Sequence, residues 1–158
     1  TILAFEKLWE EGKNINLVIV GKQGWFVDEL IKKIKEQPLL NQKLFWMNSI
    51  SDRYLDELYS VCHCLIAPSK GEGFGLPLIE AAQHKLPIIA RDLSIFREVA
   101  GDYVYYFEND DNPAILANAI ENWLNLYRKS KHPKSDQMPW LTWKESADQL
   151  VGLMVERQ

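Results

Sequence analysis

The chain has 158 residues, of which 47% are hydrophobic and 25% are charged, and its formal net charge is −4. This length and composition are typical of one globular domain that buries a core of its own. The negative charge removes the electrostatic case for a nucleic-acid-binding protein. No apolar run reaches the length that a membrane-spanning helix requires.

Two cysteines, Cys62 and Cys64, lie on either side of His63. The triplet has the residue types of a metal site, but no second group of ligands follows it, so we expect no metal here. In a strand the two thiols would face the same side, and we interpret them as buried free thiols at the edge of the core. Because the chain has no disulfide framework, its composition fits the reducing cytoplasm.

The chain opens at Thr1, directly in a helical pattern. Because an α/β fold normally begins with a strand, we interpret the chain as a fragment of a longer protein. The apolar face of this first helix consists of Ile2, Phe5, Leu8 and Trp9. The face of the next helix, which ends near Pro38, consists of Phe26, Leu30, Ile31 and Ile34.

Short apolar runs alternate with helical patterns along the rest of the chain. They predict strands at residues 16–20, 43–47, 64–67, 86–90 and 103–107. Predicted N-caps are Ser51, Ser94 and Asn112, and Thr142 to Glu145 forms a capping box. Residues 129–139 are polar and contain proline, which predicts a loop. The alternation predicts an α/β fold, namely a Rossmann-like parallel sheet with helices on both faces.

A glycine-rich stretch at residues 69–80 separates a predicted strand from a predicted helix. Gly71, Gly73 and Gly75 lie within five positions, and glycine lets the backbone approach a ligand closely. Pro77 suits the first helical position, because its missing N–H group costs nothing there. Free N–H groups and the helix dipole favour an anion at such a terminus. The stretch therefore predicts a phosphate-binding loop.

Two acids accompany this loop: Glu72 within it, and Glu80, which we expect in the first turn of the helix. Phosphate groups require N–H donors, whereas the hydroxyls of a sugar and a ribose require carboxylate acceptors. The combination therefore favours a sugar-nucleotide as the ligand. For Glu80 alone a second interpretation stays open, since an acid in a first turn stabilises a helix by about 0.3–1 kcal/mol without any ligand.

A family signature lies at these residues, which read Pro68-Ser69-x-x-Glu72-Gly73-Phe74-Gly75-Leu76-Pro77-x-x-Glu80-Ala81. The stretch resembles the E-x7-E motif of retaining glycosyltransferases of family 4, with Glu72 and Glu80 as the two acids. The resemblance continues through residues 87–90, 98–102 and 142–147. It implies the C-terminal half of a GT-B fold: a single donor-binding domain at 1–158 that includes a C-terminal helix at 142–158. The acceptor domain would be N-terminal to it, and the fragment alone would be inactive.

The resemblance also implies roles for the loop residues. Glu72 would be the catalytic residue and would hydrogen-bond hydroxyls of the transferred sugar. Glu80 would accept hydrogen bonds from both ribose hydroxyls. The backbone N–H groups that hold the sugar and the diphosphate would belong to Gly73, Phe74, Gly75 and Leu76.

Two further loops follow predicted strands at the same edge of the sheet. Ile50 matches the family position whose backbone contacts the base, although Asn48 replaces the glycine that is usual there. Lys22 follows Gly21 and could pair with the diphosphate, or it could be a solvated loop lysine beside a glycine that makes the turn. The sequence Gly-Lys-x-Gly-Trp from Gly21 resembles a variant in bacterial O-antigen mannosyltransferase-like members.

The function implied is transfer of a hexose, with retention, from a GDP- or UDP-linked donor, and GDP-mannose is favoured. The acceptor would be a glycan or a lipid-linked glycan in cell-surface polysaccharide synthesis. Because most family members need no metal and the chain has no Asp-x-Asp stretch, we expect no metal or other cofactor. The basic residues 128–134 are either a solvated loop or a peripheral contact with the inner face of the membrane.

Two other functions stay open for the same residues. One is a sugar-nucleotide epimerase of the same fold, which would require acid and base residues that we do not find. The other is a non-catalytic module that binds a nucleotide-sugar or a protein partner.

Overall fold

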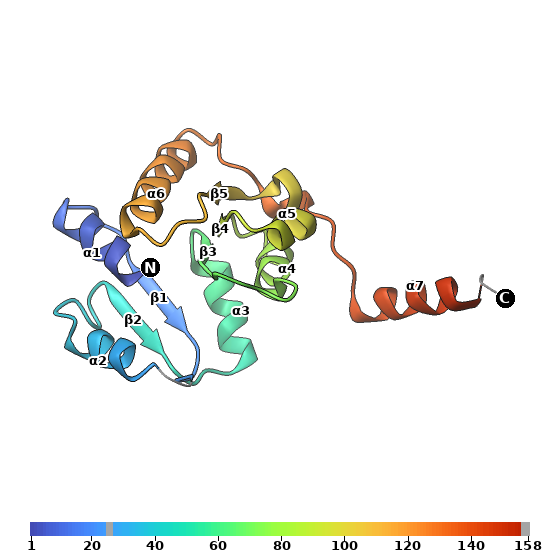
Figure 1. Ribbon diagram of the computed structural model, residues 1–158, viewed down its shortest axis with the longest axis horizontal. Coiled ribbons are helices and arrows are strands. Elements are labelled where there is room, and N and C mark those ends of the chain that lie inside the picture. Colours follow the sequence, from blue (N-terminus) through green and yellow to red (C-terminus); the bar gives the residue numbers. More distant parts are fainter. Residues whose placement is uncertain (25–26, 156–158) are drawn as a thin grey trace.

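The computed structural model describes residues 1–24 and 27–155, so the predicted helical residue Phe26 lies outside the described residues (Figure 1). The helices are α1 (Ile2–Glu10), α2 (Asp28–Glu36), α3 (Asp52–Val61), α4 (Leu76–Gln83), α5 (Ser94–Ala100), α6 (Pro113–Arg128) and α7 (Trp143–Val155). The strands are β1 (Leu17–Val20), β2 (Leu44–Met47), β3 (Leu65–Ala67), β4 (Ile88–Arg91) and β5 (Tyr105–Phe107). Two short 3₁₀ turns are η1 (Gly101–Tyr103) and η2 (Ser135–Gln137).

The strands pair in parallel. β1 pairs with β2, and β3, β4 and β5 form a second sheet in that order. Among the described residues no ladder joins β1 to β3, so the strands form two hydrogen-bonded groups. The half-buried Ile66 of β3 packs in the same core as Leu17 of β1, which keeps the groups together. The predicted fold class, parallel strands that alternate with helices, is confirmed.

Strand β4 shows that helices cover both faces of its sheet. All four of its residues are buried, and the three apolar ones enter two different cores. Ile89 packs in a core with residues of α1 and α6, whereas Ile88 and Ala90 pack with residues of α4 and α5. Successive side chains of a strand point to opposite faces. The predicted apolar face of the first helix is confirmed, since Ile2, Phe5, Leu8 and Trp9 are all buried.

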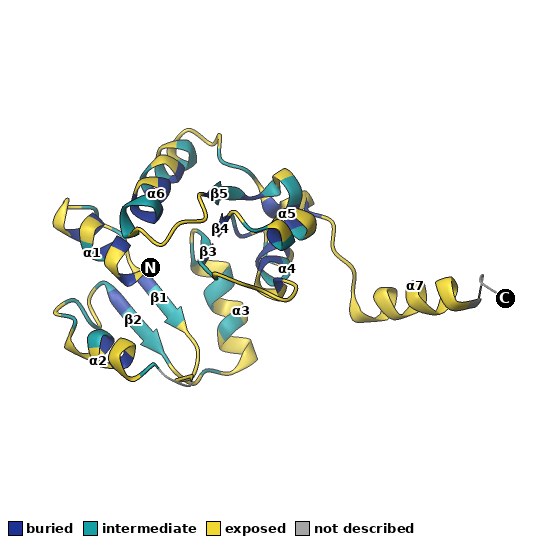
Figure 2. Cartoon of the chain, viewed as in Figure 1, coloured by how far each residue is buried: buried dark blue, intermediate teal, exposed yellow. Residues whose placement is uncertain are grey.

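Helix α7 projects from the body at the end of an extended segment (Figure 1). Its predicted capping box is confirmed: Glu145 accepts from the N–H and hydroxyl of Thr142, and the N–H of Glu145 donates to that hydroxyl oxygen. Figure 2 shows exposed residues along this helix. Its apolar side chains are largely in solvent, and Trp143 is 82% exposed.

Two predicted caps are confirmed and one is wrong. The Ser51 hydroxyl accepts from the N–H of Tyr54, and the Asn112 side chain accepts from the N–H of Ala114. Ser94, predicted as an N-cap, is instead the first residue of α5. The carbonyl of Leu93 accepts the hydrogen bond from the N–H of Arg97, and this makes Leu93 the N-cap.

The start of the last strand and the contacts of the polar loop were not predicted from the sequence. The strand predicted from residue 103 begins at Tyr105, because η1 occupies residues 101–103. The polar segment 129–139 packs against the rest of the domain through Ser135 and Met138. The buried Ser135 hydroxyl donates to the Leu86 carbonyl oxygen at 2.7 Å, and the Met138 side chain is buried as well.

Gly75 fixes the start of α4. It is the N-cap of the helix and has a φ of +93°, a conformation that favours glycine. A Cβ atom on Gly75 would lie 3.0 Å from Cε1 of the fully buried Phe96 ring. Both the backbone conformation and the close Phe96 ring therefore favour glycine at this N-cap. Helix α4 begins at Leu76, and Pro77 is its second residue rather than the first.

Arg91 at the end of β4 joins two loops. The side chain is buried, with Nε donating to the Pro68 carbonyl oxygen at 3.1 Å and Nη1 donating to the Asp110 carbonyl oxygen at 2.7 Å. Its guanidinium also lies over the Phe107 ring, 5.4 Å from the ring centre. The residue thereby holds the segment that enters the glycine-rich loop against the segment that follows β5.

The Gly75→Ala substitution is predicted to lower the free energy of unfolding by about 1–3 kcal/mol, because the methyl group meets the Phe96 ring and φ is strained. Gly73→Ala is the matched control: a Cβ atom on Gly73 would have no neighbouring atom within 4 Å, so we expect a change within about 0.5 kcal/mol. Chemical denaturation measures the free energy of unfolding of both variants. Equal stability of the two variants would contradict the packing argument.

The Arg91→Met substitution is predicted to cost about 2–4 kcal/mol, since it leaves the Pro68 and Asp110 carbonyl groups without their charged donor. Lys70→Met serves as the control, because Lys70 forms an exposed ion pair with Asp111 that we expect to contribute less than about 1 kcal/mol. Thermal unfolding compares the loss of stability in the two variants. A larger loss for Lys70→Met would show that Arg91 is not the tie between these loops.

Candidate functional site

The topology places the loops of interest at the carboxyl ends of parallel strands in both hydrogen-bonded groups. Gly21 follows β1, Asn48 follows β2, and Pro68 follows β3. In parallel α/β sheets, ligands bind outside these carboxyl ends. The loops that the sequence singled out therefore share the edge of the fold where a ligand site is expected.

The glycine-rich loop presents its backbone to solvent. Residues 70–74 are exposed, and Phe74 is 52% exposed although it is aromatic. Oε1 of Glu72 accepts a hydrogen bond of 3.2 Å from the N–H of Gly73. The Glu72 carboxylate thus occupies one of the amides that the sequence assigned to the ligand. A ligand that accepted the hydrogen bond of this amide would leave the Glu72 carboxylate available to contact that ligand.

Glu80 lies in the second turn of α4, not in the first as the sequence predicted. Because α4 begins at Leu76 after the Gly75 cap, Glu80 is its fifth residue. The effect of the helix dipole falls off within the first turn. The interpretation of Glu80 as a residue that only stabilises the helix terminus is therefore weakened.

The Glu80 carboxylate is half-buried and has a partner on α3. The hydroxyl of Tyr59 donates to Oε2 of Glu80 at 2.9 Å. Burial raises the pKa of Tyr59 far above its usual value, and the hydrogen bond to Glu80 and its negative charge raise that pKa further. The phenol is thereby kept in the protonated form that can donate.

A hollow of about 160 Å³ lies between the ends of β1 and β2 and the start of α3. Its lining brings together Gly21, Lys22 and Ile50, the three residues that the sequence predicted outside the glycine-rich loop. The remaining lining residues are Val20, Met47, Asn48, Ser49, Ser51, Asp52 and Leu55. The predicted convergence of these two loops is therefore observed.

Helix α3 links this hollow to Glu80. Leu55 of α3 lines the hollow, and Tyr59, four residues later, hydrogen-bonds to Glu80. Residues four apart lie on the same face of a helix. One face of α3 thus runs from the hollow to Glu80. Glu72 remains on the exposed loop, and among the described residues no hydrogen bond joins it to Glu80.

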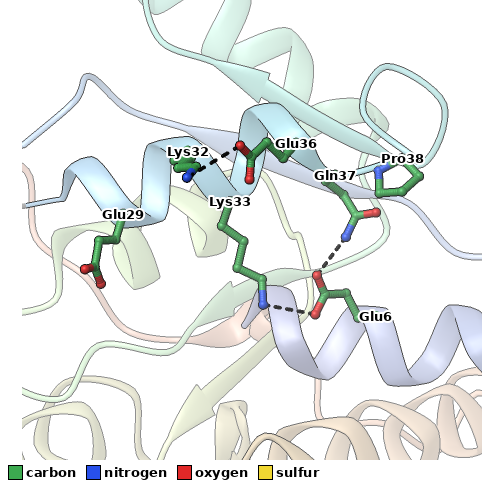
Figure 3. A pocket seen from close by; sticks show the side chains of 7 residues that line it. All are labelled: Glu6, Glu29, Lys32, Lys33, Glu36, Gln37 and Pro38. Atoms are coloured by element: carbon green, nitrogen blue, oxygen red, sulfur yellow. Dashed lines mark hydrogen bonds and ion pairs between the residues drawn. The ribbon is translucent and has the colours of Figure 1, made fainter.

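A larger hollow, of about 460 Å³, lies between α1 and α2 (Figure 3). Most of its polar lining side chains pair with one another. Lys33 pairs with Glu6 at 3.2 Å, and the Gln37 side-chain amide donates to the same carboxylate at 2.7 Å. Figure 3 shows this network and the Lys32–Glu36 pair beside it. Charges that already have partners make this hollow a weak candidate for a ligand site.

Other classes of site find no support in the residues that the structure describes. These residues contain no cluster of three or more His, Cys, Asp or Glu side chains that could hold a metal ion. Cys62 and Cys64 are half-buried free thiols, and burial raises the pKa of both. None of the described helices combines the length and the apolar character needed to cross a membrane.

Sequence reasoning missed Tyr59 and Arg91 as supports of the site. In the sequence, Tyr59 lies in a helical pattern with apolar neighbours and Arg91 directly follows an apolar run, and neither position indicates a partner. One signal was present for Tyr59, because a partly buried tyrosine usually requires a hydrogen-bond partner for its hydroxyl. No such signal identifies the carbonyl groups that Arg91 binds.

The chain matches the family described as glycosyl transferases group 1 over residues 1–137. The serotype-specific mannosyltransferase WbdA of Escherichia coli is 56% identical over 151 residues, which are 96% of this chain and 18% of that protein. The O-antigen chain mannosyltransferase RfbU of Salmonella typhimurium (strain LT2) is 29% identical over 117 residues, which are 74% of this chain and 32% of that protein. The chain thus spans only 18% of the length of WbdA.

A similar fold is found in Anabaena Alr3699/HepE, crystallised in complex with UDP and glucose. The TM-score is 0.74 at 16% identity, with all of this chain and 45% of that chain covered. At this identity the likeness concerns the fold alone. The match over residues 1–137 and the identity to WbdA confirm the resemblance inferred from residues 68–81, and the chain belongs to the glycosyl transferases group 1 family.

Proposed function

We propose that residues 1–158 form the donor-binding part of a retaining glycosyltransferase of the GT-B type. It transfers a hexose from a nucleotide-sugar, and GDP-mannose is the favoured donor. The names of two relatives support mannose as the sugar and O-antigen-like polysaccharide as the product, since WbdA and RfbU are both mannosyltransferases. The UDP in the complex of Alr3699/HepE supports a nucleotide-linked donor.

The observation that carries this proposal is the arrangement along α3. The hollow that contains Lys22 and Ile50 lies at one end of the helix face, and Glu80 lies one turn further on. In a nucleoside diphosphate the ribose lies between the base and the charged diphosphate, and its two hydroxyls project to one side. In our proposal the base lies against the backbone at Ile50, the ribose hydroxyls donate to Glu80, and Lys22 pairs with the diphosphate.

The glycine-rich loop acts on the part of the donor that reacts. Transfer breaks the bond between the anomeric carbon and a phosphate oxygen, and the bonding electron pair stays on the leaving diphosphate. A new bond forms between the anomeric carbon and a hydroxyl oxygen of the acceptor, and the leaving diphosphate takes up the proton of that hydroxyl. Amides from Gly73 to Leu76 and the ammonium group of Lys22 stabilise that charge, and for this reason we expect no metal. Glu72, released from the Gly73 amide, accepts hydrogen bonds from hydroxyls of the transferred sugar.

The acceptor site belongs, in this proposal, to an N-terminal domain outside these 158 residues. A glycan or a lipid-linked glycan is the acceptor, and the whole protein works in the cytoplasm, with any peripheral contact at the inner face of the membrane. Turnover by residues 1–158 alone would contradict this division of roles.

Replacement of Glu80 by alanine is predicted to weaken the binding of GDP or UDP by about 1–3 kcal/mol, because the ribose hydroxyls lose their acceptor. Isothermal titration with both diphosphates, and with a panel of GDP- and UDP-linked sugars, measures the affinities. Glu29→Ala, which removes an exposed acid from the hollow of Figure 3, is the control and should leave the affinity unchanged.

Three outcomes would count against the proposal. If Glu80→Ala binds as tightly as the unchanged protein, Glu80 is not part of the site. If Glu29→Ala alone weakens binding, the ligand occupies the hollow between α1 and α2. If no nucleotide or nucleotide-sugar binds, the chain is not a donor-binding domain.

A further inference from the structure

The bond between Tyr59 and Glu80 joins two helices at the candidate site. Tyr59 belongs to α3 and Glu80 to α4, both side chains are half-buried, and 2.9 Å separates the phenol oxygen from Oε2. We propose that Tyr59 is a positioning residue: its hydroxyl holds one oxygen of the Glu80 carboxylate and directs the other to the ribose hydroxyls of the donor. This inference rests on the proposed function, in which Glu80 binds the ribose.

Tyr59 is itself held in place. Its ring stacks on the His84 ring, with 5.2 Å between the ring centres and 21° between the planes. Nε2 of His84 lies 3.3 Å from Oδ1 of Asp56. Asp56 and Tyr59 come from α3, Glu80 comes from α4, and His84 directly follows α4 as its C-cap. The stacking restricts the tyrosine ring, so its hydroxyl points at Glu80 before any ligand arrives.

Such preorganisation matters for a glutamate more than for a shorter acid. An unrestrained glutamate side chain occupies many rotamers, and a ligand that requires one of them must order it on binding. Each carboxylate oxygen accepts more than one hydrogen bond, so the bond to Tyr59 leaves acceptor capacity for both ribose hydroxyls. Tyr59 therefore improves binding without contact with the ligand.

A purely structural role makes a different prediction. If the bond only ties α3 to α4, its loss would alter the site as a whole and would affect any ligand bound there. If it positions Glu80, its loss would affect only ligands that have ribose hydroxyls. The 2′,3′-dideoxynucleoside diphosphates retain the base and the diphosphate but lack these hydroxyls, so they separate the two roles.

The test uses Tyr59→Phe in the full-length protein, titrated with GDP, UDP and their 2′,3′-dideoxy forms. The phenylalanine ring retains the stacking on His84, and the unfolding midpoint checks that the variant folds. We expect roughly 5–20-fold weaker binding of the ribonucleotide that the unchanged protein prefers, because the ligand must then order the Glu80 side chain itself. Binding of the dideoxy form should change less than about twofold. Tyr54→Phe, at an exposed tyrosine of α3, is the matched control and should change the binding of neither the ribonucleotide nor its dideoxy form.

A double variant tests the coupling. Tyr59→Phe combined with Glu80→Ala should bind no more weakly than Glu80→Ala alone, because Tyr59 acts through Glu80. Equal loss for the ribose and dideoxy forms, or additive losses in the double variant, would overturn the positioning role. If Glu80→Ala weakens binding and Tyr59→Phe does not, only this inference fails. If Glu80→Ala has no effect, the proposed function of Glu80 fails as well.

Discussion

The close contact between Gly75 and the buried ring of Phe96 determines the geometry of the candidate site. The left-handed backbone of Gly75 begins α4, and the Phe96 ring leaves no room for a side chain there. This start places Glu80 in the second turn, where its carboxylate faces Tyr59 of α3. A shift of one residue in the start of α4 would rotate Glu80 by about 100° around the helix axis. The contact between a glycine and an aromatic ring thus decides which residues meet at the site.

Two other ties complete this geometry. Arg91 holds the segment before the glycine-rich loop to the segment after β5, so the loop leaves β3 in a fixed direction. Tyr59 and its stacked neighbour His84 hold α3 to α4. Residues 70–74 of the loop between these contacts remain exposed. A rigid frame around an exposed loop suits a site that must enclose the charged group of a ligand.

Much of this arrangement was predictable from the sequence. The alternation of apolar runs and helical patterns predicted parallel strands and helices on both faces, because burial imposes these patterns on the residues themselves. The caps at Ser51 and Asn112 were predictable because a side-chain oxygen there has one obvious local partner. The family was also recognisable, since residues 68–81 resemble a signature of such glycosyltransferases.

The misses have a common physical cause. Ser94 fails as a cap, and Glu80 lies one helical position later than predicted, because helix starts depend on backbone conformation at the neighbouring residue. The roles of Tyr59 and Arg91 depend on partners that are 21 and 23 residues away for their bonds to Glu80 and Pro68. Local sequence patterns carry no information about such pairs. The division of the strands into two groups depends likewise on contacts between distant segments.

The proposed nucleotide-sugar site lies at the carboxyl ends of β1, β2 and β3, against the start of α4. Amide chemical shifts of the ¹⁵N-labelled chain, recorded during a titration with GDP-mannose, test this location most directly. We expect the largest shifts at Gly21, Lys22 and Ile50 and at the amides from Gly73 to Leu76. Shifts confined to the residues around the hollow between α1 and α2, with these amides unmoved, would contradict it.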